Sequence, residues 1–202
     1  MQLRYNTSLT DKDYVRLQGW RAAILPCCPL HPQGGCSFSR HGTYARVDPS
    51  GTRIARWYCP QGHCTFSLLP DFYASHLRGS LEALEQAVGQ IENSKSVEAA
   101  ADALRTDDIS LPSAIRWARR RLRLVHAALE SVVRAAPERF SNCQPSVSSF
   151  QFQLELSSVL PELREVAAAY LHLLPSPLGF ACSSRHKRFQ HETGPDPPHP
   201  LA

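Results

Sequence analysis

Alternating apolar and polar positions mark two short strands in the first third of the chain. Residues 42–47 and 52–58 alternate in this way, and the turn-forming residues Asp48-Pro49-Ser50-Gly51 lie between them. The pattern predicts a β-hairpin. Residues 1–24 are expected to be an N-terminal extension, and residues 65–72 an apolar segment that leaves the hairpin.

Helical periodicity replaces this alternation after residue 79. A helix is expected to begin at Ser80, and Ser96 is the expected N-cap of a short Ala-rich helix over residues 97–104. Pro112 favours the start of a longer helix that runs to residue 135. Its apolar positions recur at spacings of three and four, at Ile115, Ala118, Leu122, Val125 and Leu129. A short helix, a break and a longer helix predict a helix-turn-helix-like region over residues 73–135.

Residues 136–180 are expected to be further helices, without alternating strands. One helical stripe is predicted along Leu156, Leu160, Leu163, Ala167, Tyr170, Leu171 and Leu174. Residues 181–202 are rich in proline and polar residues without periodicity, and are expected to be a disordered tail.

Five of the seven cysteines form two groups that flank the predicted hairpin. The first group holds Cys28 and Cys36 in a Pro/Gly-rich segment, and the second holds Cys59 and Cys64 around Pro60-Gln61-Gly62-His63. Thiolates on two tight turns suit a tetrahedral zinc site. The spacing predicts one structural zinc ion held by Cys28, Cys36, Cys59 and Cys64.

The ligand set has alternatives within both groups. The spacing of Cys28 and His31 is the expected one for a knuckle, whereas Cys28 and Cys36 stand further apart than usual. His63 also lies within reach of Cys59, and Gly62 occupies the position that usually carries the second cysteine. His31 and His63 are therefore substitute ligands.

The fold class that these patterns predict is α+β. A small N-terminal zinc-ribbon module with a β-hairpin, over residues 25–72, precedes an all-α domain with a helix-turn-helix and a helical bundle. No signal peptide or membrane-spanning segment is expected, because the N-terminus lacks an apolar stretch and no long apolar run occurs. With an odd number of cysteines, this points to the reducing cytoplasm.

The balance of basic residues points to nucleic acid. The chain has 19 Arg and only 3 Lys, and they are concentrated in residues 1–79 and 111–140. Five arginines fall between Arg116 and Arg123 with no acid among them. Arginine is the preferred side chain for phosphates and guanine edges. Four of these arginines are predicted to contact double-stranded DNA: Arg116, Arg119, Arg120 and Arg123.

Several motifs resemble those of one protein family. They are Arg40-His41-Gly42-Thr43-Tyr44, Ile54-Ala55-Arg56-Trp57-Tyr58-Cys59, Thr65-Phe66-Ser67 and Ile115-Arg116-Trp117-Ala118-Arg119-Arg120. Over residues 27–124 the chain resembles the zinc-ribbon and helix-turn-helix regions of bacterial insertion-sequence transposases and related uncharacterised proteins. The resemblance implies DNA recognition, whereas the chain after residue 140 lacks the pattern of a nuclease domain.

The function expected from the sequence is therefore DNA binding, in an accessory or regulatory role and without catalysis. The alternative is an interaction scaffold that binds a transposase or another protein, and a homo-oligomer is left open. A zinc enzyme ranks third, because it needs an open metal position and a nearby glutamate, and residues 1–81 contain no Glu.

Overall fold

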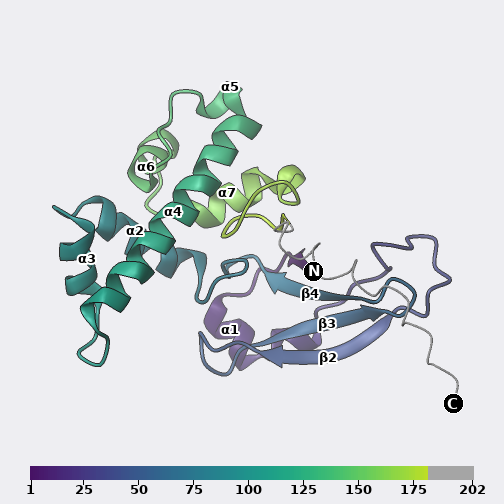
Figure 1. The fold of residues 1–202 in the computed structure, drawn as a ribbon. Helices are drawn as coiled ribbons and strands as arrows, with labels where there is room; N and C mark the ends of the chain where they lie inside the picture. The colour runs from purple at the N-terminus through teal and green to yellow at the C-terminus, as the bar shows by residue number, and fades with distance from the viewer. Residues whose placement is uncertain (182–202) are drawn as a thin grey trace, which may run out of the picture.

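The computed structural model describes residues 1–181 and has a mixed α+β fold (Figure 1). A four-stranded sheet forms one part of the molecule, and helices α2 to α7 form the other. In chain order the elements are β1 (Gln2–Tyr5), α1 (Asp11–Arg16), the 3-10 turn η1 (Gly19–Arg21), β2 (Ser39–Ala45), β3 (Arg53–Cys59), β4 (Cys64–Pro70), α2 (Leu81–Glu92), α3 (Val97–Leu104), α4 (Leu111–Ala135), α5 (Pro137–Phe140), α6 (Val147–Leu154), α7 (Leu160–Val166) and η2 (Ala168–Tyr170).

The sheet has the strand order β1-β4-β3-β2. The expected hairpin is present as β2 and β3, which pair antiparallel with Thr43 opposite Ala55. The predicted exit segment is a strand of its own, β4, which pairs antiparallel with β3. The predicted N-terminal extension supplies β1, which pairs parallel with β4 and places Gln2 beside Ser67. The backbone groups of β4 are thereby paired on both sides, as a buried strand requires.

A bulge interrupts the edge strand β2. The register with β3 shifts between Arg40 and Thr43, and Gly42 in this interval has φ +71°. Glycine adopts that left-handed backbone without the steric cost that a side chain would carry. The bulge bends β2 at the point where it passes η1.

The predicted helix start at Ser80 and the short helix over residues 97–104 with its cap at Ser96 are confirmed. The hydroxyl of Ser80 accepts a hydrogen bond from the Ala83 N–H, and the hydroxyl of Ser96 accepts one from the Ala99 N–H, both at 3.1 Å. Helices α2, α3 and α4 pack around small and aliphatic side chains, because small residues let helix backbones approach closely. This shared cluster is Ile91, Ala100, Ala101, Ala114 and Ala118.

The single helical stripe predicted for the C-terminal region is wrong. Helix α6 ends at Glu155, which has a left-handed φ of +55°, and α7 starts only at Leu160, ahead of Pro161. After Val166 the chain turns back, and the Phe180 N–H donates to the Leu171 carbonyl. Most of the predicted stripe is buried in one core cluster with side chains of α2 and α4, but Leu156 and Tyr170 are exposed.

A fully buried arginine joins the helices to the sheet. The guanidinium of Arg164, on α7, donates to the carbonyls of Asp71 and Tyr73 beyond β4, and to those of Pro177 and Leu178. Burial lowers the pKa of Arg164 to about 10, so the group remains charged near neutral pH. This buried cation is one link between the sheet and the helical part, and the ion pair of Arg4 on β1 with Glu165 on α7 is another.

Helices of sufficient length and apolarity to cross a membrane are not found in residues 1–181. The predicted disordered tail, apart from Ala181, lies outside the described residues.

Candidate functional site

Three cysteines and one histidine come together at the end of the sheet. Their side-chain ligand atoms all lie within 4.8 Å of one another, and we call this group the Cys/His cluster: Cys28, His31, Cys36 and Cys59. The His31 Nδ1 atom is 3.6 Å from the Cys28 Sγ and 3.3 Å from the Cys59 Sγ. The cluster could bind one metal ion.

The turn after η1 supplies three of the four ligands. The His31 N–H donates to the Cys28 carbonyl at 3.1 Å, and the Gly34 N–H donates to the His31 carbonyl at 2.9 Å. These consecutive tight turns bring Cys28, His31 and Cys36 to one point. Cys59, the last residue of β3, is the fourth.

The β3–β4 turn explains why the second group contributes only one ligand. The Gly62 N–H donates to the Cys59 Sγ at 3.2 Å, and a Cβ atom on Gly62 would lie 2.5 Å from the Leu30 Cδ1. The position that usually carries the second cysteine of a knuckle is therefore covered by Leu30.

Two residues expected as ligands lie outside the Cys/His cluster. Cys64, predicted as a ligand, begins β4 directly opposite Cys59 in the strand register, and its Sγ faces the Thr65 carbonyl at 3.9 Å. His63, a predicted substitute, is exposed at the tip of the turn with φ +44°. The other substitute, His31, takes the fourth position. Its spacing from Cys28 was the sequence signal for this arrangement.

The three cluster thiols are buried and electrostatically coupled. Cys28 and Cys36 are 2% exposed and Cys59 is fully buried. Burial raises the pKa of the Cys28 thiol, but hydrogen bonds from His31 and the backbone outweigh it and bring the pKa to about 6. Burial and the neighbouring Cys28 and Cys59 thiols raise the pKa of Cys36 to about 11. A metal ion bound here would compensate the negative charge of the thiolates that hold it.

The arginines predicted to contact DNA line the outer side of α4. All four are exposed, and we call them the α4 arginine face: Arg116, Arg119, Arg120 and Arg123. Arg119 donates to the Glu98 carboxylate on α3 at 2.5 Å, and Arg116 donates to the Ser113 hydroxyl at 3.1 Å. Within residues 1–181, Arg120 and Arg123 make no ion pair. Arg121 points elsewhere and stacks on Trp117, with its Cζ 4.0 Å from the ring centroid.

The connection between α3 and α4 is ordered by Arg105. This residue follows α3, donates from Nε to the Asp102 carboxylate at 2.7 Å and from Nη1 to the Ile109 carbonyl at 3.4 Å. Residues 105–110 separate the two helices, which is longer than the three or four residues of a tight helix-turn-helix. The two helices nevertheless pack directly on each other through Ala101, Ala114 and Ala118.

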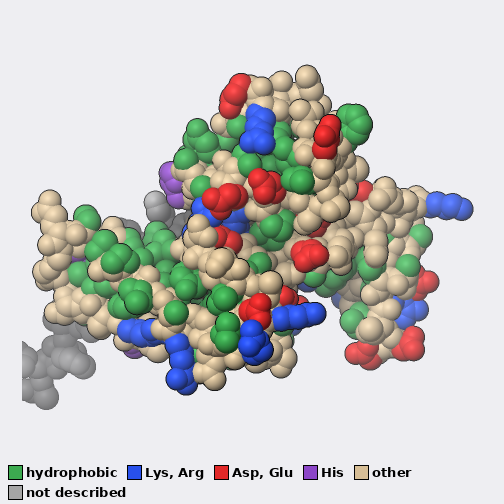
Figure 2. Space-filling view, turned by 180° about the vertical axis from the view of Figure 1, so that it is seen from behind, with side chains coloured by type: hydrophobic (Ala, Val, Ile, Leu, Met, Phe, Trp, Pro, Cys, Tyr) green, Lys and Arg blue, Asp and Glu red, His purple; other side chains and the backbone are tan. Residues whose placement is uncertain are grey.

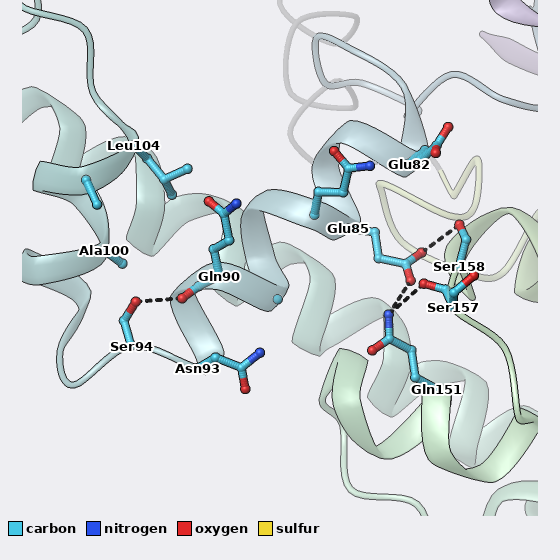
Figure 3. Close-up of a pocket in the computed structure, with 13 residues that line it drawn as sticks. Glu82, Glu85, Gln90, Asn93, Ser94, Ala100, Leu104, Gln151, Ser157 and Ser158 are labelled. Atoms are coloured by element: carbon cyan, nitrogen blue, oxygen red, sulfur yellow. Dashed lines mark hydrogen bonds between the residues drawn. The ribbon is translucent and has the colours of Figure 1, made fainter.

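A polar groove of about 700 Å³ lies between α2, α3 and the α6–α7 connection (Figure 3). Its buried carboxylate, Glu85, accepts hydrogen bonds from the Val159 and Leu160 N–H groups and from Gln151. Glu85 therefore caps the start of α7. Both oxygen atoms of the Glu85 carboxylate are engaged in holding the fold, whereas Glu82, which also lines the groove, is exposed.

No protein-family model, curated protein or solved structure matches the chain.

Proposed function

We propose that this chain is a DNA-binding protein without catalytic activity, in which α4 contacts the duplex and a zinc ion stabilises the module that contains the sheet. The observation that carries the proposal is the α4 arginine face. It is exposed along its length, and within residues 1–181 only one of its members, Arg119, is paired with a carboxylate.

The packing of α4 supports this role. Positions 116, 120 and 123 recur at helical spacing and span about 10 Å along the axis, at 1.5 Å per residue. A major groove about 12 Å wide admits one helix, whose arginines would meet phosphates and base edges. Helices α2 and α3 pack against the buried side of α4, opposite the α4 arginine face, through Ile91, Ala100 and Ala118. We interpret α3, the connection and α4 as a helix-turn-helix with a long connection, which the resemblance to transposase recognition regions implies.

The donor set of the Cys/His cluster supports zinc as the metal. Around a tetrahedral zinc ion, with Zn–S about 2.3 Å and Zn–N about 2.0–2.1 Å, sulfur and nitrogen ligands stand about 3.5 Å apart. The His31 Nδ1 lies at 3.3 and 3.6 Å from its two sulfur neighbours. Four protein ligands close a tetrahedral site, which is typical of structural rather than catalytic zinc. The ion would fasten the segment before β2 to the end of β3, in the manner of a zinc ribbon.

The second candidate is a scaffold that binds a transposase or another protein. An apolar pocket of about 300 Å³ between α3 and α4 favours it, because Ile109 and Trp117 at this pocket are 41% and 37% exposed. Exposed apolar side chains around a pocket are typical of protein interfaces.

Salt-dependent binding of duplex DNA tests the proposal. The variant Arg116→Ala/Arg120→Ala removes two exposed arginines from the face, and the control Arg134→Ala/Arg139→Ala removes two from the far end of α4 and from α5. Each lost phosphate contact lowers the log–log salt slope by about 0.9. We expect the first variant to bind duplex more weakly with a slope lower by nearly two, measured by fluorescence anisotropy, and the control to keep its slope. If both variants and the unchanged chain bind duplex DNA equally, the scaffold function would be favoured over DNA binding by α4.

A further inference from the structure

A basic hollow of about 610 Å³ opens at the edge of the sheet, away from the Cys/His cluster and the α4 arginine face. It lies where the edge strand β2 meets η1, and its lining is Gln18, Trp20, Arg21, Arg40, Thr43 and Arg53. Figure 2 shows Lys and Arg side chains along the lower margin of the part of the molecule that the sheet occupies. Three of the six lining residues are arginines. Of residues 1–181, no aspartate or glutamate lines the hollow.

Two of these arginines are held in place by hydrogen bonds to the fold. Arg40 donates to the carbonyls of Trp20 and Arg21, and so fixes η1 against β2. Arg53 donates from Nε to the Thr43 hydroxyl at 2.8 Å. Trp20 is almost fully buried and packs edge-on against Tyr14, with ring centroids 5.9 Å apart. Arg40, Trp20 and the Nε end of Arg53 are therefore held in place by the fold itself.

The guanidinium donors that remain have no partner within the described part of the chain. The Arg21 side chain and the terminal nitrogens of Arg53 make no hydrogen bond or ion pair there, whereas Arg4, Arg16, Arg105, Arg119 and Arg134 are each paired with a carboxylate. Like charges that converge on one hollow repel each other unless an anion lies between them.

We propose that this hollow is a binding site for a phosphate group, held by Arg21 and Arg53 with Arg40 as the fixed wall between them. A phosphate carries up to two negative charges and presents several acceptor oxygens, whereas a carboxylate carries one charge and presents two. Two guanidinium forks with free donors, on Arg21 and Arg53, together with the positive charge of Arg40, match the former better. The Gln18 amide and the Thr43 hydroxyl add neutral polar groups to the lining. The phosphate is that of a soluble phosphate ester or of a nucleic acid backbone, and only the second case rests on the proposed function.

Calorimetric titration with sodium tripolyphosphate at low salt tests the site itself. The variant Arg21→Ala/Arg53→Ala removes two exposed side chains, of which only Arg53 makes a contact, to Thr43, so the fold is expected to be kept. Lys12→Ala/Arg78→Ala is the matched control, because it removes two exposed positive charges that do not line the hollow. Thermal melting verifies that both variants are folded.

We expect the Arg21/Arg53 variant to lose affinity for tripolyphosphate by about tenfold or more, since the charge-assisted hydrogen bonds of two guanidinium groups would be lost. The control should stay within about twofold. Absence of tripolyphosphate binding by the unchanged chain, or equal losses in both variants, would overturn the proposal.

A second arm with random-sequence duplex identifies the source of the phosphate. If the Arg21/Arg53 variant also lowers the salt slope for duplex, the phosphate is that of DNA. If duplex binding is unchanged while tripolyphosphate binding is lost, the hollow takes a soluble phosphate ester. The Arg116→Ala/Arg120→Ala variant should keep its affinity for tripolyphosphate in either case, so failure of the hollow and failure of the α4 arginine face are distinguishable.

Discussion

The Nδ1 atom of His31 lies 3.3 Å from the Sγ atom of Cys59, although 28 residues separate them in the sequence. The contact joins the turn before β2 to the last residue of β3. The Cys/His cluster therefore takes three residues from the segment before β2 and one from the end of β3. The knuckle spacing predicts two ligands from each of the two segments.

Single substitutions distinguish these two arrangements. We expect His31→Ala to weaken zinc binding by about tenfold or more, because loss of even an outer-shell partner of a ligand typically costs 10–100-fold in affinity. Cys64→Ser and His63→Ala should each retain about one equivalent of zinc with unchanged affinity, since neither side chain is in the cluster. Competition with a chromogenic chelator measures all three. Loss of zinc from Cys64→Ser and retention by His31→Ala would restore the arrangement in two pairs.

Arg164 offers a stability test of the joint between sheet and helices. Substitution by Ala would leave buried carbonyls of Asp71, Tyr73 and Leu178 without their donor. We expect Arg164→Ala to lower the free energy of unfolding by about 3 kcal/mol or more, because each buried carbonyl left without a donor costs about 1–3 kcal/mol. Urea denaturation measures the change. Arg134→Ala is the control, because Arg134 is 66% exposed in its pair with Glu130, and surface pairs contribute about 0–1 kcal/mol. Equal midpoints for the two variants would contradict the structural role of Arg164.

Glu85 makes a similar prediction for the polar groove. In Glu85→Gln an amide nitrogen would replace one of the oxygens that accept from the Val159 and Leu160 N–H groups, so that donor would face donor. We expect a loss of about 1–3 kcal/mol in the free energy of unfolding. Glu82→Gln, in the same groove but exposed, should change stability by less than about 0.5 kcal/mol. Equal free energies of unfolding for the Glu85→Gln and Glu82→Gln variants would contradict this structural role of the Glu85 carboxylate.

The parts of the fold that local patterns determine could be predicted from the sequence. Ser80 and Ser96 cap their helices through bonds to N–H groups three residues away, and Pro112 marks the start of α4. The pairing of β1 with β4 could not be predicted from the sequence. It places Gln2 beside Ser67, and no local pattern near either residue indicates a partner so far away in the sequence. The contacts of Arg164 could not be predicted either, because its acceptors are the carbonyls of Asp71 and Tyr73, just after β4, and those of Pro177 and Leu178.

At the candidate site, residue type was predictable and spatial arrangement was not. The spacing of Cys28, Cys36 and Cys59 indicated the metal-binding region, but the choice between His31 and Cys64 depends on the register of β3 with β4 and on Leu30 covering Gly62. The sequence showed that basic residues are concentrated in residues 1–79 but did not show the basic hollow, because β2, β3 and η1 each supply one of its arginines.

The ion pair between Arg119 and Glu98 changes what is expected of the α4 arginine face. The sequence between Arg116 and Arg123 holds no acid, but the neighbouring helix α3 places one there, with its carboxylate 2.5 Å from the Arg119 guanidinium. Arg119 is therefore already partly neutralised, and the pKa of Glu98 lies below its ordinary value because of a hydrogen bond from its own backbone N–H and the charge of Arg119.

Removal of this acid should strengthen duplex binding. In Glu98→Gln a negative charge is lost beside α4 and Arg119 becomes free to meet a phosphate, so, if α4 contacts DNA as proposed, we expect tighter binding and a salt slope steeper by up to about 0.9. Arg119→Ala should cost less affinity than Arg120→Ala for the same reason, since Arg120 has no carboxylate partner within the described residues. Anisotropy titrations at several salt concentrations measure both effects, with Glu82→Gln as a charge-matched control on α2. Because Glu98 is exposed, its pair with Arg119 contributes little stability, and the variants should melt within a few degrees of the unchanged chain. A folded Glu98→Gln variant with unchanged affinity and slope would show that Arg119 does not reach the duplex, and would confine contact to Arg116, Arg120 and Arg123.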